Sequence, residues 1–231
     1  MASRFTPINA SYVLLVEGDD DKYFFNKICA TFNPSPTIKV AVPKDFNGQN
    51  SKGGVFESLP PLLKQLADGS LSKLAVIVDA DYEEQHGLGY QRTIQKITTL
   101  LTQQDFVLIQ NTENHEPGLV FENGSELANF GLWVMPNNQD SGMLEDFVKA
   151  CIKTDELSLF EHATQVVHAI SEPKFKPHHY AKAEVATWLA WQKQPGHGLY
   201  CAVKDNLLNT DYTLFQELEQ WLKKIFPNSS N

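Results

Sequence analysis

Short apolar runs alternate with amphipathic segments along the first half of the chain. Apolar runs bounded by polar turns are typical of buried strands, and apolar residues that recur every three or four positions are typical of helices. This pattern predicts strands at 11–16, 38–42, 74–78, 105–109, 118–122 and 131–135, and helices at about 20–32, 55–67 and 90–102. Strands that alternate with helices indicate an α/β fold with a mostly parallel sheet covered on both faces by helices.

The pattern changes to helices alone after Pro136. Helices are predicted at 142–153, 156–171, 178–193 and 211–226. We therefore expect a core of about residues 8–150, followed by a helical C-terminal region, 151–231, that packs on the core. Within the core, the polar, glycine-containing stretch 47–54 precedes the helix that is predicted to begin near Val55.

The overall charge excludes one simple class of function. The chain has 231 residues, of which 42% are hydrophobic and 20% charged, and its formal net charge is −9. A chain of this balance does not bind nucleic acid through bulk positive charge, although metal ions and a local basic patch can still supply the attraction.

Cysteine usage and hydropathy favour a cytoplasmic protein. Cys29, Cys151 and Cys201 are far apart and form no CxxC pair, and the apolar helical settings of Cys29 and Cys151 predict core thiols. The N-terminus has no signal-peptide pattern, and no apolar stretch approaches the ~20 residues that a membrane span needs. We expect a reducing cytoplasm and no membrane association.

Two acidic clusters stand where predicted strands end, and they carry most of the chemical information. The first, Glu17–Asp21, follows the strand at 11–16, and the second, Asp79–Glu83, follows the strand at 74–78. Functional groups collect beyond the carboxyl ends of strands in an open parallel sheet. Crowded carboxylates repel one another unless protons or a cation neutralise them, and oxygen-only ligands favour Mg²⁺ or Mn²⁺. The sequence therefore predicts a magnesium site that handles phosphate.

Ordinary structural roles can account for some of these acids. Asp19 and Asp20 stand where helix caps stand, and Glu83 can equally be a solvated loop charge. Glu17 lies at the end of a buried strand and is followed by glycine, so its carboxylate needs a partner.

Two other phosphate-handling folds with strand-end aspartates fit less well. A receiver domain also opens with an apolar strand and an acidic cluster, but here Gly18 interrupts that cluster and the second site is a DxD rather than a lone aspartate. A haloacid-dehalogenase-type phosphatase requires DxDx[TV], and residue 83 is Glu.

Taken together, Val16-Glu17-Gly18-x-x-Asp21 and Asp79-x-Asp81-x-Glu83 resemble the two signature motifs of the Toprim domain. This domain is the catalytic module of topoisomerases, primases, old-type nucleases and ribosomal RNA maturases. The segments Leu132–Asn138, Ser141–Asp146 and Lys182–Gln192 are similar to an uncharacterised family of stand-alone Toprim proteins, so the resemblance covers nearly the whole chain.

The resemblance implies a set of metal ligands for one or two Mg²⁺ ions: Glu17, Asp21, Asp79, Asp81, Glu83 and Glu145. Glu83 would be a weaker outer ligand, and Glu17 would act as a ligand or as the general base. Lys182 would be the cation that stabilises charge at the phosphorus.

The activity that follows is Mg²⁺-dependent hydrolysis of phosphodiester bonds in DNA or RNA, as in the Toprim half of old-type nucleases. No tyrosine-bearing cleavage domain, zinc ribbon or GxxxxGK[ST] motif accompanies the acidic motifs, which argues against a topoisomerase, a replicative primase and a complete old-type nuclease. The best local basic run for contacting nucleic acid comprises Lys174, Lys176, His178, His179 and Lys182.

Two alternatives stay open at the level of sequence. One is a Toprim-fold phosphoesterase that acts on nucleotides, and the other is a non-catalytic nucleic-acid binding module that depends on a protein partner. The sequence gives no indication of the oligomeric state.

Overall fold

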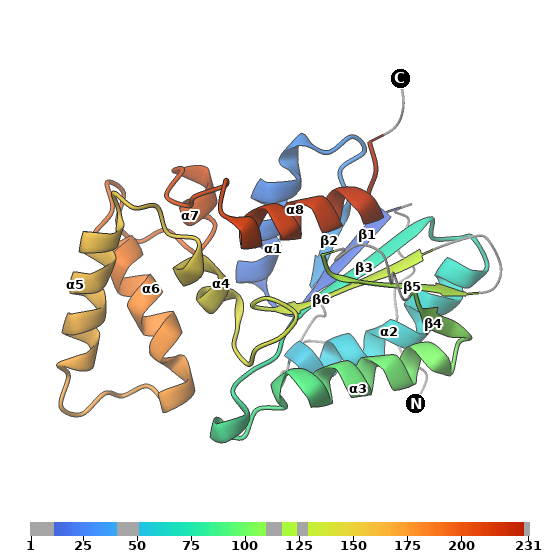
Figure 1. Cartoon of the computed structure of the whole chain (residues 1–231), viewed down its shortest axis with the longest axis horizontal. Coiled ribbons are helices and arrows are strands. Elements are labelled where there is room, and N and C mark those ends of the chain that lie inside the picture. Colours follow the sequence, from blue (N-terminus) through green and yellow to red (C-terminus); the bar gives the residue numbers. More distant parts are fainter. Residues whose placement is uncertain (1–11, 41–50, 110–116, 124–128, 229–231) are drawn as a thin grey trace.

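A six-stranded mixed sheet forms the centre of the molecule (Figure 1). The computed structural model describes residues 12–40, 51–109, 117–123 and 129–228. The strands are β1 (Tyr12–Val16), β2 (Thr37–Val40), β3 (Lys73–Asp79), β4 (Phe106–Leu108), β5 (Leu119–Asn123) and β6 (Asn129–Met135), in the order β2-β1-β3-β6-β5-β4. β2, β1, β3 and β6 are parallel, whereas β5 is antiparallel to both β6 and β4. The predicted α/β fold with a mostly parallel sheet is confirmed.

Helices cover both faces of this sheet and continue beyond one end of it (Figure 1). The α-helices are α1 (Asp19–Ile28), α2 (Ser51–Ala67), α3 (Gly89–Thr102), α4 (Leu144–Ala150), α5 (Leu157–His168), α6 (Tyr180–Ala190), α7 (Cys201–Lys204) and α8 (Thr213–Ile225). The described residues also form the 3₁₀ turns η1 (Cys29–Thr31), η3 (Glu83–Gln85) and η4 (Pro177–His179). α1 and α8 lie on one face of the sheet, and α2 and α3 lie on the other.

The alternation of side chains along each strand divides the core into two layers. In β1, Leu14 packs into the layer under α1 and α8, whereas Val13 packs into the layer under α2 and α3. Because both faces are buried, the central strands are apolar at nearly every position. On the α8 side, the rings of Trp133 and Trp221 lie 5.6 Å apart.

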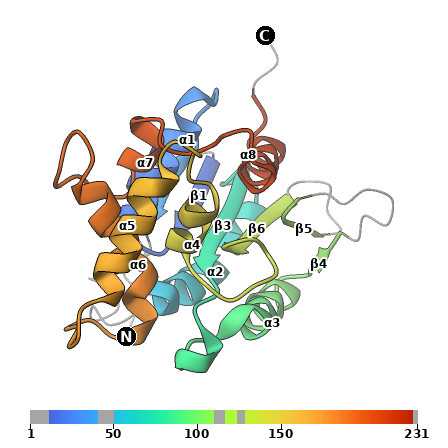
Figure 2. The same ribbon diagram turned by 60° about the vertical axis from the view of Figure 1, so that its left-hand side comes forward.

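The C-terminal helices share the core layer of α1 and α8. α5 and α6 lie side by side beyond α4, as Figure 2 shows. Glu184 of α6 is buried and joins these helices, because its carboxylate lies 2.6 Å from Lys149 Nζ and 2.7 Å from His168 Nε2.

The structure differs from the sequence-based prediction at the start of α2. This helix begins at Ser51 rather than near Val55, so the end of the polar stretch 47–54 is helical; residues 47–50 lie outside the described residues. Glycine is a poor helix former, but burial of this turn beside the sheet outweighs the low propensity of Gly53 and Gly54. The short helix α7 was also not predicted, since four residues are too few to show a helical period.

All three cysteines are buried free thiols, as predicted for Cys29 and Cys151. Burial raises the pKa of each of these two thiols to about 12. Within the described ranges, no helix has both the length and the apolar character that a membrane span would require.

Candidate active site

A pocket of about 640 Å³ opens where the carboxyl ends of β1 and β3 meet the first turns of α1 and α4. Its walls include the following acidic residues: Glu17, Asp19, Asp20, Asp21, Asp79, Asp81 and Glu145. Lys52, Lys182, His178 and His179 line the same pocket. Because parallel strands end at one edge of the sheet, two clusters about sixty residues apart in sequence share a single space.

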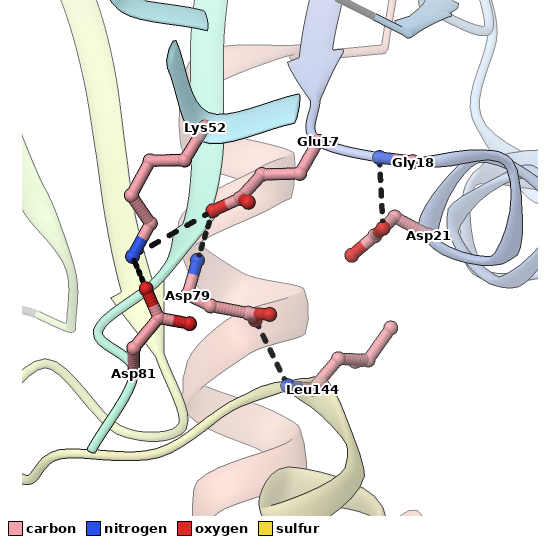
Figure 3. Close-up of polar contacts among 7 residues, drawn as sticks. All are labelled: Glu17, Gly18, Asp21, Lys52, Asp79, Asp81 and Leu144. Carbon is pink, nitrogen blue, oxygen red and sulfur yellow. Dashed lines mark hydrogen bonds and ion pairs between the residues drawn. The ribbon is translucent and has the colours of Figure 1, made fainter. Parts of the chain in front are cut away.

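Glu17 connects the end of β1 to the end of β3, and this residue is only 8% exposed. Glu17 Oε1 accepts a hydrogen bond of 2.8 Å from the backbone N–H of Asp79 (Figure 3). Lys52 Nζ lies 4.0 Å from the same oxygen and donates a 2.5 Å hydrogen bond to Asp81 Oδ2. The buried lysine therefore links carboxylates from both acidic clusters.

The first turn of α1 and the first turn of α4 are each fixed by an aspartate side chain. Asp21 Oδ2 accepts the backbone N–H of Gly18 at 3.0 Å, and Asp146 Oδ2 accepts that of Met143 at 2.9 Å. Each aspartate stands three residues after the residue whose N–H it accepts, so it pairs with the N–H group just before the helix. Both helices consequently begin at the pocket with their partial positive charge towards the acids.

Asp79 connects the sheet to α4. Its Oδ1 accepts the backbone N–H of Leu144 at 3.0 Å (Figure 3), and its own N–H is bound to Glu17. One residue thus ties the end of β3 to β1 and to α4. The backbone of Asp79 makes the bond to Glu17, and its side chain makes the bond to α4.

Asp81 occupies a turn that is fixed by its backbone. Its φ is +62°, a left-handed conformation that aspartate tolerates better than most residues. Its N–H and carbonyl pair with the carbonyl and N–H of Gly142 at 2.8 and 3.2 Å. Gly142 has a φ of +144°, and a Cβ there would lie 2.8 Å from Asp146 Oδ2, which favours glycine at this close approach.

Burial raises the pKa values of three acids in the pocket, Glu17, Asp21 and Asp79, and repulsion from neighbouring carboxylates adds to the effect. Burial raises the pKa of Glu17 to about 7, with Lys52 opposing the change. Burial and then the charge of Glu145 raise the pKa of Asp21 to about 6. Burial, followed by the charge of Glu17, raises the pKa of Asp79 well above its ordinary value.

Lys182 is the cation nearest to Glu145, at 3.8 Å. Burial raises the pKa of Glu145, and the charge of Lys182 opposes that effect. Burial also disfavours the charged form of Lys182, but Glu145, Asp79 and Asp21 outweigh it and raise the lysine pKa. Lys182 is therefore held protonated at the edge of an acidic pocket.

The donor set suits a hard divalent cation, although it does not form a finished coordination sphere. In the part of the chain that the structure describes, no three His, Cys, Asp or Glu side chains are arranged to hold one metal ion as they stand. Lys52 instead neutralises Glu17 and Asp81 in this structure. The pocket nevertheless offers oxygen ligands and an excess of negative charge, which are the properties that Mg²⁺ requires.

The pocket brings together most of the residues that the sequence singled out, namely Glu17, Asp21, Asp79, Asp81, Glu145 and Lys182. Glu83 is not among the residues that line it. The turn at Asp81 redirects the chain into η3, where the exposed carboxylate of Glu83 lies 2.5 Å from Arg92 Nη2. The position of Glu83 therefore supports its role as a solvated loop charge rather than its role as an outer metal ligand.

Lys52 is the residue that the sequence-based reasoning missed. It lies in the polar, glycine-containing stretch 47–54, in which the sequence indicated no functional residue. The available signal was its place in the chain, because the connection that follows β2 begins at the same edge of the sheet as the two acidic clusters. Tyr82 was also missed, and its hydroxyl donates a 2.5 Å hydrogen bond to Asp146 Oδ2.

Comparison with known proteins identifies a family and no characterised relative. The family described as "Protein of unknown function (DUF3226)" matches residues 11–227. No curated protein matches the chain, and no solved structure does. The matched range includes both acidic clusters, Lys182 and α8, so the pocket and the C-terminal helices lie within one family unit.

Proposed function

The chain belongs to the DUF3226 family, whose description names no activity, and we propose from its pocket that it is a Mg²⁺-dependent nuclease that hydrolyses phosphodiester bonds in DNA or RNA. One observation carries the proposal. Glu17, Asp21, Asp79 and Glu145 come from three separate segments of the chain, line one pocket, and have raised pKa values. Strongly perturbed carboxyl groups that converge in a cleft are typical of catalytic sites.

Asp21, Asp79 and Glu145 would hold Mg²⁺, with Asp81 joining them if its bond to Lys52 is released. The ion would supply charge neutralisation at the phosphoryl oxygens and activation of water. The acidic motifs that resemble those of Toprim domains support the same assignment. One or two ions, with Mn²⁺ as a substitute, are consistent with this number of carboxylates.

Glu17 is proposed as the general base. A general base works best when its pKa is near the operating pH, and burial raises the pKa of Glu17 to about 7. The hydrogen bond from the N–H of Asp79 keeps its carboxylate directed at the pocket, where it takes the proton of the attacking water. Lys182 is placed to neutralise charge that develops on the phosphoryl oxygens.

A nucleic-acid substrate is supported by the basic run at the rim. His178, His179 and Lys182 line the pocket, and Lys174 and Lys176 are exposed in the segment that leads to them. The lysines of this run can hold a phosphate backbone even when the net charge of the chain is −9.

A second candidate, hydrolysis of nucleotides or other small phosphate esters, is favoured by the acidity of the pocket. Among the described residues, its lining includes seven carboxylate side chains and two lysines, and additional phosphates of a polymer would meet this negative surface. A partner protein that supplies positive charge would make the third alternative, a non-catalytic binding module, possible as well.

The deciding experiment measures cleavage of single- and double-stranded DNA and RNA, and release of phosphate from nucleotides, with Mg²⁺, Mn²⁺ or EDTA. We expect metal-dependent cutting of a polymer that is lost in Glu17→Gln and in Asp79→Asn. Glu83→Gln is the matched control, because Glu83 is an acid of the same motif that pairs with Arg92 outside the pocket. Hydrolysis of nucleotides without polymer cleavage would select the second candidate.

A further inference from the structure

A second, smaller cavity adjoins the carboxylate pocket along α6. Its volume is about 230 Å³, and it lies between α6 and the segment 196–199. The two cavities share four lining residues: Asp20, Glu145, Lys182 and Leu199. We call this cavity the α6 groove, and a molecule bound in the carboxylate pocket can extend directly into it.

The chemistry of the α6 groove differs from that of the carboxylate pocket. One wall consists of Val185, Ala186, Leu189 and Ala190, and the other contains Gly196, His197 and Gly198. Acidic and basic side chains occur at the end that is shared with the carboxylate pocket. Apart from His197, the rest of the groove is lined by aliphatic side chains and glycines, and this largely apolar slot begins beside a charged site.

His197 gives this slot an aromatic edge. Its Nδ1 lies 3.2 Å from the hydroxyl of Tyr200, which fixes the orientation of an exposed imidazole ring. Flat heterocycles stack on such rings, and stacking on aromatic side chains is how proteins bind single-stranded nucleic acid without reading its sequence.

We propose that the α6 groove binds one unpaired nucleobase of the substrate, so that the enzyme acts on single-stranded nucleic acid. This inference rests on the proposed nuclease function. A cavity of about 230 Å³ is smaller than the 300–1,000 Å³ typical of sites for drug-sized ligands, and it suits a single ring system. A base inside a duplex is stacked and paired, and it could enter such a slot only after extrusion from the helix.

The charges at the mouth of the groove set the orientation of the nucleotide. Asp20 and Glu145 repel a phosphate, whereas Lys182 attracts one. The phosphate consequently stays beside Lys182 in the carboxylate pocket, and the uncharged base occupies the slot. The scissile bond is then adjacent to a base that the protein holds.

Equilibrium binding tests this inference. The probe is a fluorescein-labelled single-stranded octanucleotide, measured by anisotropy against the full chain with Ca²⁺ in place of Mg²⁺. The comparison ligands are a hairpin duplex and a series of octanucleotides that each lack one base. Ala186→Leu fills the groove from an exposed position, and Ala150→Leu is the matched control on α4, outside both cavities.

We expect the wild type to bind the single strand about tenfold more tightly than the hairpin, a factor within the range of one stacked base. Removal of the base at one position should weaken wild-type binding by about tenfold and leave Ala186→Leu binding unchanged, since the variant has already lost that contact. Ala150→Leu should behave as the wild type. Equal binding of all ligands by the wild type, or equal losses in wild type and Ala186→Leu, would overturn the proposal.

A second pair of variants guards against misfolding. His197→Ala removes the aromatic edge of the α6 groove. His162→Ala is the control, because His162 does not line the groove and its exposed ring lies 5.3 Å from the ring of Trp191. Only His197→Ala should weaken single-strand binding. Cleavage with Mg²⁺ is measured in parallel. Base-dependent binding without cleavage would reject the proposed nuclease function. Cleavage without base-dependent binding would reject the proposed role of the α6 groove.

Discussion

The carboxylate of Glu17 accepts the backbone N–H of Asp79 at 2.8 Å, and this bond joins the residue that follows β1 to the last residue of β3. This hydrogen bond needs an acceptor atom in the side chain of residue 17, but that side chain does not have to be titratable. Glutamine can therefore replace the structural contact of Glu17 without replacing its acid–base chemistry.

Glu17→Gln should reduce kcat by about 10²–10⁴-fold, the usual contribution of a general base. The fold should be retained, because the amide oxygen can accept the N–H of Asp79. Cleavage rates at pH 5 to 9, with circular dichroism as the check on folding, measure this. Wild-type rates in Glu17→Gln would rule out the assignment of Glu17 as the base.

The stability of the metal-free protein should depend on pH through the same residue. Burial raises the pKa of Glu17 from 4.5 to about 7, so the folded state binds more protons than the unfolded chain between these values. The contribution of Glu17 to the free energy of unfolding is therefore full below pH 4.5 and lost as the pH rises through 7. Urea titrations in EDTA should give similar stabilities for wild type and Glu17→Gln at low pH, with the variant gaining on the order of 3 kcal/mol by pH 8. A difference that does not change with pH would contradict the prediction.

Mg²⁺ should raise the thermal midpoint more at pH 8 than at pH 5. Protons and metal ions compete for the carboxylates of Asp21 and Asp79, whose pKa values are raised. Differential scanning calorimetry with MgCl₂ and with NaCl of equal ionic strength separates specific binding from screening. The shift should be lost in Asp79→Asn, and an equal shift in that variant would place the ion elsewhere.

Lys52→Met should lower activity at neutral pH and move the acidic limb of the pH–rate profile upward. Lys52 opposes the rise in the pKa of Glu17, so its removal raises that pKa further and leaves less of the base ionised. Lys64→Met is the control, because Lys64 is an exposed lysine of the same helix. If both variants give the wild-type profile, Lys52 has only a structural role.

Gly118→Ala should destabilise the protein much more than Gly69→Ala. Both glycines have a positive φ, +74° and +78°, so each substitution costs about 1–2 kcal/mol in backbone strain. A Cβ at residue 118 would also lie 2.2 Å from Cδ1 of Trp221, whereas a Cβ at residue 69 meets nothing within 4 Å. Urea unfolding should show an additional loss of about 1–3 kcal/mol for Gly118→Ala, the usual cost of overpacking. Equal losses would mean that Trp221 moves aside freely.

Local pattern was sufficient for the features that depend on neighbours in sequence. β1 and β3 were predictable because buried parallel strands are apolar throughout, and the rule that strand ends meet at one edge then placed Glu17 near Asp79. The helical patterns of α4, α5, α6 and α8 were also visible in the sequence, but which of their residues join the core of the sheet depends on long-range packing.

The remaining features depend on contacts between distant segments. The role of Lys52 follows from where α2 begins relative to β3, and the exclusion of Glu83 follows from the backbone turn at Asp81. The burial of Glu184 between Lys149 and His168 is equally a property of three helices together. No periodicity within a single segment carries that information.

The packing of Trp221 against Trp133 has a consequence for synthesis of the chain. Translation delivers β6 long before α8, so one face of the sheet emerges from the ribosome without the helix that covers it. During that interval the nascent chain exposes Trp133, and transiently exposed apolar surface of this kind is prone to association. Folding of this domain is therefore completed late in translation, when residues 213–225 have emerged from the ribosome, rather than when the strands have paired.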